Sequence, residues 1–106
     1  MVVLKVLSRL GKILRLDEDK WNHVLEHPEM ENQIDRLRET VVDPDEVRKS
    51  VYDPSVWLFY RFYADTPVTE KYLLVIAKIS NKEGFIVTSF FTNRVKTGGL
   101  VWKKKP

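Results

Sequence analysis

The sequence predicts an α+β fold in which an N-terminal β-hairpin and two to three helices precede an antiparallel sheet of three to four strands. Three observations indicate it: two short β-branched runs at the start, an acidic middle stretch with apolar residues at helical spacing, and long runs of Val, Ile, Phe, Tyr and Thr after residue 55. A chain of 106 residues is too short for two hydrophobic cores. We therefore expect a single domain over residues 1–106.

The N-terminal part is expected to form the hairpin and the first helix. Residues 2–7 and 12–16 are apolar and rich in β-branched residues, and the short segment between them is typical of a hairpin. Asp17 stands at a predicted N-cap, with two more acids in the first turn, where they favour the positive end of a helix. The helix should run to His27, because Pro28 cannot continue it.

Two further helices are predicted before the sheet. Residues 30–41 place four apolar side chains on one helical face and charged side chains elsewhere. Residues 43–46 read Asp-Pro-Asp-Glu, which combines an N-cap, a proline at the first helical position and an acid at the position of a capping box. This pattern predicts a third, short helix.

The rest of the chain is expected to be β-structure. Residues 56–63, 71–80 and 85–92 are dense in β-branched and aromatic residues. The link at residues 81–84 is short enough to require an antiparallel hairpin. Residues 100–102 are expected to add an edge strand before a lysine-rich tail.

Charge is distributed unevenly along the chain. The net charge of +3 combines a basic block over residues 1–16, at +4, an acidic block over residues 17–46, at −8, and a basic block over residues 47–106, at +7. We therefore expect acidic helices packed on a basic sheet. This indicates either solvated helix and strand faces or an anionic ligand on the sheet side.

Composition also excludes several classes of protein. The absence of cysteine excludes disulfides, thiolate nucleophiles and cysteine-based zinc sites, and it suits a reducing compartment. The longest apolar stretches have the length of strands, so we expect no membrane span. Residues 1–16 lack the small-residue cleavage site of a secretory signal. We expect a cytoplasmic location, and nothing in the sequence indicates an oligomeric state.

The two histidines form a His-x-x-Glu-His string with Glu26. At i and i+4 of a helix, His23 and His27 would share one face, as in the inverted zinc-protease pattern. A catalytic zinc needs a third protein ligand, which here would have to be a carboxylate such as Glu70 or Glu83. The plainer interpretation is two solvated or capping histidines near a helix C-terminus.

A third interpretation uses the imidazoles as acid and base without a metal or any other cofactor. Both rings point away from the apolar stripe of the predicted helix and are free to meet a ligand. RNA cleavage by attack of the 2′-hydroxyl, through a 2′,3′-cyclic phosphate, needs a base, an acid and a cation for the phosphorane charge. His23 would be the base, His27 or a water the acid, and Arg61 or Lys78 the cation.

Arg61 interrupts a strand of aromatic residues. Period-two alternation places Trp57, Phe59, Arg61 and Tyr63 on one face, where an unpaired guanidinium is costly. Its partner would be either a helix carboxylate such as Glu26 or Glu29, or a phosphate.

Several polar residues near the later strands are candidate phosphate ligands. Lys78 ends an apolar run, although a lysine there is often merely exposed. Hydroxyls and a cation follow on and after the last long strand, at Thr88, Ser89, Thr92 and Arg94. Each is a plausible phosphate donor, although threonine is also an ordinary strand residue.

The chain resembles the small phage-associated nuclease domains of the barnase, EndoU, colicin E5/D and RelE-like group. The resemblance covers roughly residues 12–102 and rests on a diffuse pattern: Trp21-x-His23, His27-Pro28-Glu29, Pro44-Asp45-Glu46-Val47, Leu58-Phe59-Tyr60-Arg61, and Gly84-Phe85-Ile86-Val87-Thr88-Ser89-Phe90. It implies helices before a four-stranded antiparallel sheet and a metal-independent ribonuclease. Such proteins are often toxins that act on tRNA or other RNA, and an antitoxin or immunity protein would be the partner. By position, the resemblance makes His23 the leading acid or base, supported by Arg61, Thr88 and Thr92.

The leading functional hypothesis is therefore RNA cleavage by His23, His27 and Arg61. The alternative is a non-catalytic module that binds RNA or a protein through the same basic sheet. The third is a zinc hydrolase built on the His-x-x-Glu-His string.

Overall fold

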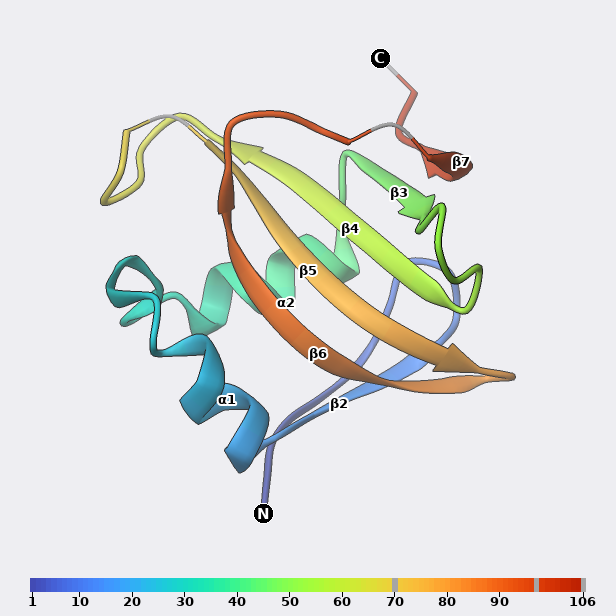
Figure 1. The fold of residues 1–106 in the computed structure, drawn as a ribbon, viewed down its shortest axis with the longest axis horizontal. Helices are drawn as coiled ribbons and strands as arrows, with labels where there is room; N and C mark the ends of the chain where they lie inside the picture. The colour runs from blue at the N-terminus through green and yellow to red at the C-terminus, as the bar shows by residue number, and fades with distance from the viewer. Residues whose placement is uncertain (70, 97, 106) are drawn as a thin grey trace.

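Seven strands form one mixed sheet in the computed structural model, which describes residues 1–69, 71–96 and 98–105 (Figure 1). The strands are β1 (Val2–Leu7), β2 (Ile13–Asp17), β3 (Glu46–Lys49), β4 (Val56–Tyr63), β5 (Lys71–Ser80), β6 (Glu83–Thr92) and β7 (Gly99–Lys103). Their order in the sheet is β1-β2-β6-β5-β4-β3-β7. β2 and β6 run parallel, and the other neighbouring pairs are antiparallel.

The predicted arrangement of two to three helices followed by a three- to four-stranded antiparallel sheet is wrong, although the class is α+β. The predicted N-terminal hairpin exists as β1 and β2, but it is part of the sheet. β2 pairs with the first residues of β6, from Ile13 opposite Glu83 to Arg15 opposite Phe85. This parallel pairing joins segments about seventy residues apart, and no local pattern in the sequence indicates it.

The helices are shorter than predicted. α1 (Glu18–Val24) ends three residues before His27, and the following backbone makes two tighter turns, in which Glu26 N donates to His23 O and His27 N donates to Val24 O. A 3-10 turn, η1 (Pro28–Met30), precedes α2 (Ile34–Val42). Neither α-helix, of seven and nine residues, is long and apolar enough to cross a membrane, and the described residues hold no other α-helix.

The third helix, predicted from Asp43-Pro44-Asp45-Glu46, is not formed. The chain enters β3 at Glu46, between β4 and β7. Val47 is fully buried in the core, and the Asp45 carboxylate accepts a hydrogen bond from the backbone of Phe62 at 2.7 Å. Pairing on two sides satisfies the backbone of this segment better than one isolated helical turn would.

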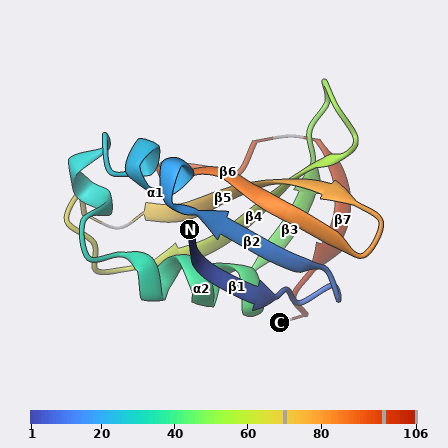
Figure 2. The same ribbon diagram turned by 90° about the horizontal axis from the view of Figure 1, so that it is seen from below.

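α2 covers one face of the sheet, with β1 and β2 curling round beside it (Figure 2). The core between them contains Leu4, Val6, Leu14, Leu16, Leu37, Val41, Val47, Phe59, Val75, Ala77 and Ile86. A second cluster of Val24, Met30 and Leu73 packs α1 and η1 beside it. We call the opposite side of the sheet the open face. Side chains alternate along a strand, so the residues next to a core residue in a strand point to the open face.

Candidate functional site

The two histidines do not share a helix face, since α1 ends at Val24. The His23 side chain is 59% exposed, and its Nδ1 lies 3.3 Å from a carboxylate oxygen of Glu26. His27 Nδ1 lies 3.8 Å from Glu29, and its ring is 5.7 Å from that of Phe90. His23 thus has a local partner on the surface, whereas His27 also contacts Phe90, which alternation along β6 places on the opposite side of the sheet from α2.

The metal-binding hypothesis gains no support from this geometry. The described residues contain no group of three His, Asp or Glu side chains placed to hold a metal ion. Of the two carboxylates considered as a third ligand, Glu83 lies at the start of β6, whereas Glu70 lies outside the described residues.

Arg61 is tied to carboxylates at the end of α2. Its Nη1 donates to the backbone carbonyl of Asp43 at 2.6 Å and to the Asp43 carboxylate at 3.1 Å, and its Nε lies 3.4 Å from Glu39. Of the two predicted partners, the structure shows the helix carboxylate, but from α2 and not from Glu26 or Glu29. Arg61 and the imidazoles are therefore not brought together.

Tyr63 completes this cluster of Arg61, Glu39 and Asp43. Its hydroxyl donates to Glu39 at 2.5 Å, and the Arg61 guanidinium lies 5.6 Å from its ring centroid. Burial and this hydrogen bond raise the pKa of Tyr63 to about 12. The cluster joins α2 to β4, so its role is to hold these two elements together and not to bind a ligand.

The other predicted phosphate ligands are divided between the two faces. Ser89 is fully buried and donates to the backbone carbonyl of Leu74 at 2.8 Å, so its hydroxyl is already used. Alternation from Ser89 places Thr88 and Thr92 on the open face. Arg94 is exposed in the segment after β6. Lys78 also reaches the open face.

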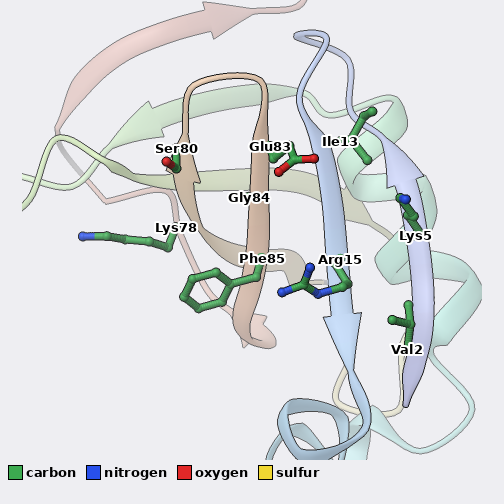
Figure 3. Close-up of a pocket in the computed structure, with 9 residues that line it drawn as sticks. All are labelled: Val2, Lys5, Ile13, Arg15, Lys78, Ser80, Glu83, Gly84 and Phe85. Atoms are coloured by element: carbon green, nitrogen blue, oxygen red, sulfur yellow. The ribbon is translucent and has the colours of Figure 1, made fainter.

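The open face carries a hollow of about 370 Å³ that the sequence did not reveal (Figure 3). Its side chains come from four adjacent strands. Strand register aligns Lys5 with Arg15, Arg15 with Phe85, and Phe85 with Lys78. Together these four residues form one row across the sheet, which we call the basic row.

The aromatic ring lies within the basic row. Figure 3 shows Phe85 between Arg15 and Lys78, and the residue is 38% exposed. Val2, Ile13, Ser80, Glu83 and Gly84 complete the lining. A flat ring with cations on both sides can hold a molecule whose neutral planar group stacks on the ring and whose anionic groups pair with the cations.

Acidic residues partly balance the basic row. Arg15 Nε lies 3.2 Å from Asp17, in a pair whose side chains are 52% and 36% exposed. Lys78 Nζ lies 2.6 Å from Asp53. Hydrogen bonds from Lys78 and Ser55 lower the pKa of Asp53 to about 2. Lys5 has no ion pair among the described residues. Exposed pairs such as these are weak enough for a phosphate to replace the carboxylate.

Alternation along each strand was a usable signal for the face to which the side chains of Lys5, Arg15 and Lys78 point. Only the register between the strands shows that they lie in one row.

A scan against protein-family models found no match, and searches of curated proteins and of solved structures found none either. The resemblance to the barnase, EndoU, colicin and RelE-like group therefore stays a prediction.

Proposed function

We propose that this protein is a non-catalytic module that binds single-stranded RNA across the open face of its sheet. The observation that carries the proposal is the basic row of Lys5, Arg15, Phe85 and Lys78. Adjacent strands are about 4.8 Å apart, so the row spans roughly 14 Å across four strands. That length accommodates a few nucleotides of an extended strand running across the β-strands.

Each part of the row suits one part of a nucleotide. Phe85 offers an accessible ring on which a base can stack, and such stacking tolerates any base. Lys5, Arg15 and Lys78 can neutralise backbone phosphates on both sides of that base. Thr88, three residues along β6 on the same face, offers a hydroxyl to a phosphate or ribose oxygen, whereas Thr92 lies at the other end of β6 from Phe85.

The positions of the imidazoles argue for binding without cleavage. Cleavage needs a base, an acid and a cation around one phosphodiester. His23 and His27 lie beside Glu26 and Glu29, and neither is among the residues that line the hollow. Arg61 belongs to the helix-covered side of the sheet and is bound to Asp43.

Fluorescence anisotropy with a labelled single-stranded RNA, measured over a range of salt concentrations, tests the proposal. We expect affinity to fall as salt rises, and Phe85→Ala to weaken binding by about fivefold to a hundredfold through the lost stacking. Lys78→Gln should lower the magnitude of the salt slope by about 0.7, the share of one phosphate contact on a single strand. Asp53→Asn should tighten binding, since it releases Lys78.

Lys82→Gln is the matched control, because Lys82 is exposed at the turn between β5 and β6 and does not line the hollow. The same RNA is also incubated with excess protein in EDTA and analysed by gel. Absence of binding, or Phe85→Ala and Lys78→Gln variants that bind like wild type, would overturn the proposal. Cleavage that His23→Ala abolishes would replace it with the ribonuclease hypothesis.

A further inference from the structure

The two outermost strands of the sheet approach each other on the α2 side. β1 and β7 stand at opposite ends of the strand order. Nevertheless, the guanidinium of Arg9, in the turn after β1, lies 5.0 Å from the ring centroid of Trp102 on β7. The backbone N–H of Arg9 donates to Val41 O at the end of α2, at 3.0 Å. Curling of the sheet around α2 brings these edges together.

A second hollow, of about 310 Å³, lies at this junction. Its lining consists of Arg9, Asp43, Trp102, Lys103, Lys104 and Lys105, which are four cations, one carboxylate and one ring. None of these residues belongs to the basic row. We call this hollow the edge hollow.

The one carboxylate among the described residues that line the edge hollow is already engaged. Asp43 accepts from Lys104 Nζ at 3.0 Å and from Arg61 Nη1 at 3.1 Å. Arg9, Lys103 and Lys105 have no carboxylate partner among the described residues. Three cations around one concave surface repel one another, and an anion bound between them relieves that repulsion.

Arg9 and the start of the tail are held in place. Arg9 is fixed by its backbone bond to Val41 and by the Trp102 ring, and a guanidinium lying on a ring keeps its N–H edge free for two parallel hydrogen bonds. The backbone N–H of Lys104 donates to Asp45 O at 2.9 Å. The Arg9 guanidinium and the backbone at Lys104 are therefore partly preorganised. These cations have a second effect, because positive charge near the last turn of α2 stabilises the negative end of the helix dipole. Stabilisation of the dipole does not require a guanidinium held in one orientation, as that of Arg9 is.

We propose that the edge hollow is a second anion site that takes a phosphate group, with Arg9 as the bidentate donor and Lys103 and Lys105 as the neutralising charges. The group is either free phosphate or a backbone phosphate of RNA. The site shares no residue with the basic row, so it stands or falls independently of the function proposed above.

Calorimetric titration of the full chain with inorganic phosphate, compared with sodium chloride at matched ionic strength, tests the proposal. We expect saturable binding of phosphate and none of chloride. Arg9→Gln should weaken phosphate binding at least tenfold. Arg9→Lys should weaken it nearly as much, because the charge remains but the fork is lost. Lys105→Gln should weaken it severalfold, and Lys82→Gln should not change it.

Lys105 is exposed in the tail, so its variant keeps the test valid if substitution of Arg9 unfolds the protein. The proposal would be overturned if phosphate and chloride released the same heat on injection. It would also be overturned if folded Arg9→Gln or Lys105→Gln bound phosphate as wild type does. RNA anisotropy then identifies the source of the phosphate. If it is the RNA backbone, Lys105→Gln weakens RNA binding and free phosphate competes. If it is free phosphate, RNA affinity stays at the wild-type value. Phe85→Ala, outside the edge hollow, tests RNA binding separately.

Discussion

At the scale of single residues, the partner of Arg61 follows from its place in β4. Alternation puts Arg61 on the same face as Phe59, against α2, where the carboxylates of Glu39 in the helix and of Asp43 at its C-cap lie within reach of the guanidinium. The Arg61 side chain is 23% exposed, and its Nε is buried without a hydrogen-bond acceptor among the described residues. The guanidinium is thus partly desolvated and depends on Asp43.

Arg61→Met should therefore affect stability and not RNA binding. Loss of the two hydrogen bonds to Asp43 should lower the free energy of unfolding by about 1–3 kcal/mol. Arg38→Met, at an exposed position of α2, is the control and should change it by less than about 0.5 kcal/mol. Urea unfolding and RNA anisotropy measure the two properties. Weaker RNA binding with unchanged stability would return Arg61 to the phosphate-binding role that the sequence suggested.

At the scale of elements, strands were predicted better than their arrangement. The expected strands at residues 56–63, 71–80 and 85–92 correspond closely to β4, β5 and β6, because β-branched and aromatic runs between turn residues are local signals. The capping pattern at residues 43–46 is also local, but pairing with two strands overrides it. The basic row combines residues from four strands, so Lys78 was identified while Lys5, Arg15 and Phe85 were missed.

Gly84 controls the junction at which the predicted hairpin joins the rest of the sheet. It pairs with Leu14 on β2 and with Ile79 on β5. A Cβ at this position would lie 2.6 Å from the carbonyl oxygen of Lys78 and 2.9 Å from Leu14 Cδ2. The first contact is with backbone, so the strands themselves would have to move apart.

We expect Gly84→Ala to lower the free energy of unfolding by about 1–3 kcal/mol, the usual cost of overpacking. It should also weaken RNA binding, because displacement of β6 from β2 separates Phe85 from Arg15. Gly99→Ala in β7 is the matched control: its nearest contact would be Lys49 Cβ at 3.8 Å, an ordinary distance. Urea unfolding and anisotropy of both variants measure the effects. Equal stability of the two alanine variants would show that the junction has room for a side chain.

At the scale of the whole molecule, the uneven charge of the sequence becomes a set of contacts between distant segments. Asp43 ends α2, and its carboxylate binds Arg61 on β4 and Lys104 after β7. One acidic residue thus links the middle of the chain to two basic segments that follow it. Asp43 thus connects the acidic block over residues 17–46 with the basic block over residues 47–106.

The link through Asp43 makes stability depend on pH in acid. Chiefly because Lys104 donates a hydrogen bond to it, the pKa of Asp43 lies below its ordinary value of 3.8. The folded protein therefore binds fewer protons at Asp43 than the unfolded chain does. This contribution is fully present above pH 3.8 and is lost as pH falls through the lower, folded-state pKa.

Comparison of wild type with Asp43→Asn by chemical denaturation, from neutral pH to about pH 3, tests this assignment. At neutral pH the variant should be less stable by no more than about 1 kcal/mol, because the carboxylate is half exposed and a negative charge at the end of α2 opposes the helix dipole. The difference should shrink as the pH falls, since wild type loses a charge that the variant never had. Glu31→Gln, an exposed acid after η1, should show no such convergence. A constant difference between wild type and Asp43→Asn at all pH values would mean that packing or capping, and not the charge on Asp43, joins α2 to β4 and to the C-terminal tail.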